Sequence, residues 1–252
     1  MIYKSQTKKS AFGNTIFLRF QLSREFIVTS IGLLVAIFSA IPLYAQSGNG
    51  ACGSLKASYG PYDYRTDRDK LPIVEGAHFT AEVEALIRGT SATRPGGDIA
   101  YTLRAIPNNH RALLAMMRLG EKEKTPLPSG STYSVECWFD RAIRFRPDDG
   151  VVRMIYSTYL KNRARIPEAT SQLEIATTYA KDSAITHYNI GLHYFNLKNY
   201  DKALMQAHKA MALGWTQTDL RDQLRSVGKW TEPTELPAPA SPAASASVEQ
   251  AK

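Results

Sequence analysis

The sequence predicts an all-α fold, a short α-solenoid of antiparallel helix hairpins with an irregular N-terminal extension and a disordered tail. Small and aromatic residues recur at one fixed interval in the second half of the chain, and loop-forming residues separate segments of helical length. The 252 residues are 44% hydrophobic, which is ordinary for a folded protein. We therefore expect one compact helical body that is large enough to bury a core.

The first 45 residues are predicted to be a signal peptide or an N-terminal membrane anchor. An uncharged apolar run, residues 26–41, follows a basic lead and precedes a polar segment, which is the order of a secretory signal. The small Ala45 suits cleavage, although Leu43 is large for the usual pattern. Left uncleaved, the apolar stretch 26–45 is long enough to span a bilayer, with its basic side in the cytoplasm. A buried core helix is a third reading, but such a helix would show a polar face.

Both favoured readings place the rest of the chain outside the cytoplasm, in the periplasm or exported. The two cysteines, Cys52 and Cys137, are then a disulfide candidate, because an oxidising compartment favours an isolated pair. Lipid attachment at Cys52 stays open as an alternative, although no leucine-led lipobox precedes it. Residues 46–97 have no clean period, and we expect an irregular segment there with one short helix over residues 80–87.

The repeat is visible in its alanines. Ala142, Ala176 and Ala210 follow one another at steps of 34 in the numbering, and Ala169 and Ala203 are separated by the same step. A fixed period of this length indicates one helix–turn–helix unit stacked repeatedly.

The unit over residues 184–217 is the clearest. Its spaced positions are His187, Ile190, Gly191, Tyr194, Ala203, Ala207 and Ala210. This pattern closely resembles the tetratricopeptide repeat (TPR) family, in which a large residue, Leu-Gly and Tyr lie on a first helix and Ala, a large residue and Ala on a second. The chain departs from it at His187, Ala207 and Trp215, where the family prefers Trp, an aromatic residue and Pro.

Two further units precede this one. Residues 150–183 keep most of the spaced positions, and Pro167 stands where the second helix would begin, at a position that tolerates proline. The unit before that is expanded, with a first helix over 109–120, a long turn over 121–132 and a second helix over 135–145.

The repeat domain is expected to span residues 98–230. Residues 98–106 read as a lone second helix at its start, and residues 218–227 as a capping helix that solvates the open end of the solenoid. Residues 231–252 are rich in Pro, Ala and Ser and are predicted to be disordered. The spacing assigns the following residues to the repeat core: Ala142, Tyr156, Ala169, Ala176, Ile190, Gly191, Tyr194, Ala203 and Ala210.

The resemblance implies a concave face lined by first helices, where TPR proteins bind extended peptides or helices. The positions there that the core does not use are Met154, Thr158, Lys161, Asn162, Tyr188, Asn189, Leu192 and Phe195. The asparagines suit a peptide backbone, because an amide both donates and accepts hydrogen bonds. The alternative for Tyr188 and Phe195 is that they only cover a neighbouring repeat. Met154, Ile155 and Ile185 stand where a carboxylate-gripping groove would need basic groups, so that mode is not expected.

The predicted function is a non-catalytic adaptor or scaffold of the periplasm that binds another protein or a peptide segment. The alternative is a membrane-anchored assembly factor of an envelope, secretion or cytochrome-maturation complex, with inner-membrane contact only if the N-terminal segment is uncleaved. Nucleic acid is not expected: of 31 basic and 23 acidic side chains, five basic and one acidic precede residue 26, and the rest form no basic stripe.

An enzyme or a metal-binding protein is the remaining alternative. Its candidate groups are His78, His110, His187, His193 and His208, with Glu75, Asp98 or Glu136 as companions. No catalytic motif, haem-attachment motif or zinc-ligand spacing joins them, so we expect no cofactor.

Overall fold

The computed structural model describes residues 52–91 and 93–233, and within these residues the chain is all-helical, with 61% helix and no strand. The predicted signal peptide or anchor (1–45) and the predicted tail from residue 234 onward lie outside the described residues. Within the described part of the chain, no helix is both long and apolar enough to cross a membrane.

The described residues form one short 3-10 helix, Arg68–Lys70, and ten α-helices. The α-helices are α1 Leu71–His78, α2 Ala81–Glu84, α3 Pro95–Ala105, α4 His110–Lys122, α5 Val135–Phe145, α6 Gly150–Lys161, α7 Ile166–Ala180, α8 Ala184–Asn196, α9 Tyr200–Ala212 and α10 Asp219–Ser226.

The helix boundaries repeat the interval seen in the sequence. α6 and α8 begin one repeat period apart, and so do α7 and α9. The side chains that cap α6 and α8 keep this spacing: Asp149 accepts from the amides of Val151 and Val152, and Ser183 accepts from that of Thr186. Each of these two units therefore folds from local signals that occur at the same place in its own sequence.

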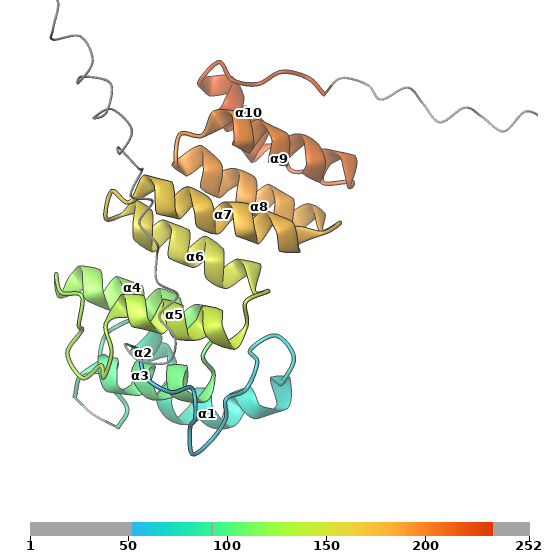
Figure 1. Cartoon of the computed structure of the whole chain (residues 1–252). Helices are drawn as coiled ribbons and strands as arrows, with labels where there is room; N and C mark the ends of the chain where they lie inside the picture. The colour runs from blue at the N-terminus through green and yellow to red at the C-terminus, as the bar shows by residue number, and fades with distance from the viewer. Residues whose placement is uncertain (1–51, 92, 234–252) are drawn as a thin grey trace, which may run out of the picture. The chain divides into compact units, whose positions relative to one another are not determined.

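Successive helices stack in chain order from α5 to α9, as Figure 1 shows from green to orange. α6 packs against α7 and α8 against α9 as hairpins, and each second helix also packs against the first helix of the next unit, α5 on α6 and α7 on α8. The first helices α4, α6 and α8 contact one another in turn, and α10 closes on α8 and α9. This is a helical repeat-like arrangement.

Small side chains lie where the helices approach most closely. Ala169 and Ala203 are fully buried, and so are Ala142, Ala176 and Ala210 to within 1%. Gly191 is the tightest point, since a Cβ added there would lie 2.5 Å from Leu220 Cδ2 and 3.2 Å from Gln206 Cβ. The remaining predicted core residues, Tyr156, Ile190 and Tyr194, fill the space between helices, with Tyr156 only partly buried.

The segment expected to be irregular contains α2 within the short helix predicted over residues 80–87, and it also contains α1, which was not predicted; α3 begins at Pro95, three residues before the predicted boundary. α1 was missed because Pro72 and Gly76 disfavour a helix interior, yet Pro72 lies in the first turn, where its missing N–H is not needed, and Gly76 faces open space. Both short helices pack on α3, and α2 also contacts α4. The N-terminal segment is thus part of the folded body.

A strap formed by residues 52–64 is fastened to α5. Cys52 and Cys137 form a disulfide with an S–S distance of 2.07 Å. The buried Arg141 donates from Nη1 to the carbonyls of Cys52 and Ser54, at 3.0 and 2.7 Å, and Arg144 donates to that of Gly53 at 3.0 Å. The predicted disulfide is confirmed, and charge-assisted hydrogen bonds hold the backbone beside it.

A buried polar network joins the far end of the strap to the start of α6. Asn108 Nδ2 donates to Asp63 Oδ1 at 2.7 Å and to Asp149 Oδ2 at 2.8 Å, and Arg146 donates to Asp63 at 2.6 Å. His110 Nε2 lies 2.9 Å from Asp149 Oδ2. Burial by itself would raise the pKa of Asp149, but these hydrogen bonds from His110 and Asn108 hold it below its usual value.

The expanded turn between α4 and α5 is an ordered loop, residues 123–134. Val135 donates to the Pro126 carbonyl at 2.8 Å, and Trp138 Nε1 donates to Ser131 Oγ at 2.9 Å. The loop crosses the first turn of α3 so closely that a Cβ on Gly96 would lie 2.2 Å from the Ser129 carbonyl oxygen. The loop therefore has a fixed place against α3.

Candidate partner-binding face

The first helices α4, α6 and α8 lie side by side and together form one surface, which we call the first-helix face. The second helices pack behind them, so residues of the first helices that do not point toward a second helix form this surface. Because α6 and α8 start one repeat period apart, equivalent positions on them recur at the same interval.

Four of the predicted binding residues lie on this face with open or partly open side chains. Lys161 and Asn162 at the end of α6 are exposed, and Asn189 and Leu192 on α8 are half-buried. Asn162 is already engaged, because its Nδ2 donates to Glu121 Oε1 at 2.7 Å. That hydrogen bond ties the end of α6 to the end of α4.

Met154 and Tyr188 do not fit the predicted role. They are exposed to only 5% and 7%, and both belong to the second core cluster. The Tyr188 ring packs 5.0 Å from Trp215, and its hydroxyl donates to Asp219 Oδ2 at 3.2 Å. Burial and this hydrogen bond raise the pKa of Tyr188 above its ordinary value. The assignment of Met154 and Tyr188 to a binding surface is therefore corrected: both side chains pack in the interior.

Thr158 and Phe195 are half-buried and make contacts within the protein. Thr158 Oγ1 donates to the Met154 carbonyl at 3.3 Å and lies 3.4 Å from His193 Nδ1. The Phe195 ring lies 5.3 Å from that of Tyr200 at the start of α9. Their contribution to a partner surface is limited to the part of each side chain that stays uncovered.

Two exposed apolar residues on this face were not among the predicted binding residues. Val151 is 39% exposed and Ile185 is 53% exposed, and they occupy the same position in the first turns of α6 and α8. Ile185 stands at a position where carboxylate binding would need a basic group. Its apolar side chain at that position was the signal that could have identified it as a contact residue. The two side chains are thus an exposed apolar pair in equivalent positions of adjacent first helices.

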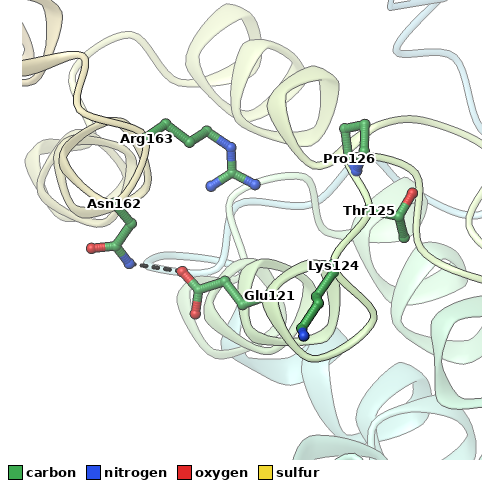
Figure 2. Close-up of a pocket in the computed structure, with 7 residues that line it drawn as sticks. Glu121, Lys124, Thr125, Pro126, Asn162 and Arg163 are labelled. Carbon is green, nitrogen blue, oxygen red and sulfur yellow. Dashed lines mark hydrogen bonds between the residues drawn. The ribbon is translucent and has the colours of Figure 1, made fainter.

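A hollow of about 670 Å³ lies at the opposite end of these helices, between the ends of α4 and α6 and the start of the loop. Figure 2 shows Arg163 extending from the end of α6 toward Pro126, with Glu121 and Asn162 joined across the base. Arg163 Cζ lies 3.6 Å from the centre of the Tyr159 ring. The lining residues are Gly120, Glu121, Lys124, Thr125, Pro126, Asn162 and Arg163.

The histidines named for an enzymatic alternative lie in separate places. His78 Nδ1 is 2.9 Å from Asp98 Oδ1 and 3.2 Å from Ser91 Oγ, so the aspartate and the serine meet the same ring nitrogen. In a serine–histidine–aspartate triad the two partners meet opposite nitrogens. His187 is buried, with its ring nitrogens 2.7 Å from Gln206 Oε1 and from the Lys181 carbonyl oxygen.

The remaining acidic companions are engaged in hydrogen bonds. Glu75 accepts from Asn109 at 2.8 Å, and Glu136 accepts from the Tyr156 hydroxyl and from Arg165. Within the described residues, no three His, Cys, Asp or Glu side chains are grouped so that they could hold a metal ion.

Comparisons with protein-family models, with curated proteins and with solved structures find no match to this chain.

Proposed function

We propose that this chain is a non-catalytic adaptor of the tetratricopeptide type, which binds a segment of another protein on its first-helix face and works outside the cytoplasm. The common interval between equivalent caps and helix starts supports the repeat class. The disulfide between Cys52 and Cys137 is compatible with an oxidising compartment.

The observation that carries the proposal is the exposed pair Val151 and Ile185. Two apolar side chains that stay partly exposed in equivalent positions of adjacent helices favour a surface that becomes covered. Asn189, which is half-buried on α8, adds an amide that can donate to and accept from a peptide backbone. This combination suits a partner segment that buries its own apolar side chains against Val151 and Ile185. The Asn189 amide can then form hydrogen bonds with the backbone of that segment.

Site-specific photocrosslinking tests the proposal in the full chain, expressed in its own cells. A photoreactive amino acid at Ile185 should capture a discrete partner band, because that side chain lies on the first-helix face. The same amino acid at Met205, which is 66% exposed on the second helix α9, is the matched control. Capture that is equal at both positions, or absent at Ile185, would contradict the proposal.

With the photoreactive amino acid placed at Val151 instead, Ile185→Asp is expected to reduce capture of that partner about tenfold, because a charge replaces an apolar contact. Met205→Asp introduces the same charge at a site that is more exposed than Ile185 and should leave capture unchanged. Thermal unfolding of both variants should match the original protein within about 0.5 kcal/mol, since both positions are on the surface.

A further inference from the structure

The hollow at the ends of α4 and α6 is lined by more basic than acidic side chains. Its walls contain two basic side chains, Lys124 and Arg163, and one acidic side chain, Glu121. Glu121 already accepts a hydrogen bond from Asn162.

The basic groups that line the hollow differ from several other arginines of the described residues. Arg65, Arg111 and Arg165 all form ion pairs with carboxylates. Among the described residues, no ion pair is formed by Lys124, by Arg163 or by Lys161. Positive charge near a helix C-terminus is favourable for the helix, yet an unpaired group in a hollow is also available to an anion.

Arg163 is the group best placed to bind. Its guanidinium lies 3.6 Å from the centre of the Tyr159 ring, and Nη1 lies 3.4 Å from the Tyr159 carbonyl oxygen, so the side chain is held in one orientation. Figure 2 shows the guanidinium directed into the space between α6 and the loop. A planar guanidinium fixed in this way can donate two parallel hydrogen bonds to one carboxylate.

We propose that the hollow binds an acidic side chain of the partner segment, with Arg163 as its ligand. This inference rests on the proposed adaptor function and names the chemistry of the partner. Val151 in the first turn of α6 and Lys161 at its last residue are ten residues apart, about 15 Å along the helix axis, and Arg163 follows two residues later. The partner segment therefore has apolar residues at one end and Asp or Glu about 15 Å away at the other.

The test begins with a phage-displayed library of random twelve-residue peptides, selected on the purified oxidised protein. Selected sequences should be enriched in Asp or Glu at one end and in apolar residues at the other. Synthetic fluorescein-labelled versions of the selected peptides are then titrated by fluorescence anisotropy. Their affinity should fall as salt is raised, and replacement of the acidic residue by its amide should weaken binding about tenfold.

Variants of the protein locate the site. Arg163→Gln should weaken the selected peptide at least fivefold, and Arg163→Lys should weaken it less, because the charge remains but the fork is lost. Glu121→Gln should tighten binding about twofold, because it removes the one carboxylate from the wall. Lys229→Gln removes the same charge from an exposed position elsewhere and should leave affinity unchanged.

The outcomes separate this inference from the adaptor function. Selection of no peptide at all overturns both. Selected peptides without acidic residues overturn only the acidic partner, and acidic peptides that bind Arg163→Gln as well as the original protein overturn the site. If a single-stranded oligonucleotide or vesicles of phosphatidylglycerol bind more tightly than the peptides, and lose that binding in Arg163→Gln, the hollow serves a different anion and the inference fails.

Discussion

His193 is the histidine of α8 that faces the neighbouring first helix, close to Thr158 and Lys161. Removal from water and the charge of Lys161 lower the pKa of His193 from 6.5 to about 4. The ring is therefore neutral in the folded protein at neutral pH. Its Nδ1 lies 3.4 Å from the Thr158 hydroxyl, a contact that links α6 to α8.

The stability of the protein should decrease as the pH falls from about 6.5 to about 4. In this range the unfolded chain binds a proton at His193 and the folded protein does not, so acid favours unfolding. The expected contribution is on the order of 3 kcal/mol, measured by urea unfolding at several pH values.

His193→Gln should flatten that part of the pH profile, because it removes the titrating group. His208→Gln is the control, since His208 lies on the second helix α9, with its Nε2 2.8 Å from the Thr231 carbonyl oxygen. An unchanged slope in His193→Gln would show that other groups set the acid response.

Gly191 shows how one element limits the sequence of another. α10 packs on α8 at this residue, and the Leu220 side chain occupies the space where a Cβ would lie. Leu220 and Leu224 of α10 are 1% and 0% exposed, so the capping helix completes the second core cluster. The capping helix α10 therefore extends the hydrophobic core, and it also covers the end of the helix stack with polar residues.

Gly191→Ala should destabilise the protein by about 1–3 kcal/mol, because the added methyl group overlaps Leu220 and Gln206. Gly76→Ala is the matched control within a helix. No atom lies within 4 Å of a Cβ at Gly76, so alanine there should stabilise the protein by about 0.5–1 kcal/mol. Thermal or urea unfolding of both variants provides the comparison, and equal effects would contradict the close packing at Gly191.

At the level of elements, the sequence predicted most of the helices and loops that are determined by residues close together in the chain. The hairpins α6–α7 and α8–α9 were predicted because their alanines and caps repeat in register, and the long loop before α5 because its prolines interrupt the period. α1 was missed because a short helix that contains Gly76 has no periodic signal of its own and depends on packing against α3.

The candidate binding residues were harder to predict for the same reason. Met154 and Tyr188 occupy positions that point away from the second helix of their own unit, so helical spacing marks them as free. The burial of Tyr188 depends on Trp215 and Asp219, which follow the repeat and meet it only in three dimensions. The hollow at Arg163 depends in turn on the path of an expanded loop, which the spacing does not specify.

At the scale of the whole described body, the strap joins parts of the chain that are distant in sequence. The disulfide links residues 85 positions apart. Arg141 and Arg144 bind carbonyl groups of the strap that lie 89 and 91 positions earlier, and Asn108 binds Asp63 of the strap, 45 positions earlier. The strap thus connects the N-terminal helices to α5 by covalent and polar contacts, whereas the hairpins are held by apolar packing.

Joint replacement of Cys52 and Cys137 by Ser should lower the free energy of unfolding by about 2–4 kcal/mol, because the unfolded chain regains the freedom of a long loop. Dithiothreitol should have a similar effect on the original protein and none on the double variant. Urea unfolding with and without the reductant measures both. A double variant as stable as the oxidised protein would show that Arg141 and the polar network suffice to hold the strap.

The presence of only two cysteines in this sequence simplifies its oxidative maturation. Two thiols permit a single intramolecular pairing, so no scrambled isomer of one chain exists and no reshuffling by an isomerase is required. The competing reaction is between chains, and it is favoured while Cys52 is already in the oxidising compartment and Cys137, which is 85 positions later, has not yet reached it. Yield at high expression should accordingly be limited by covalent dimers, and an oxidant supplied only after synthesis is complete should suppress them.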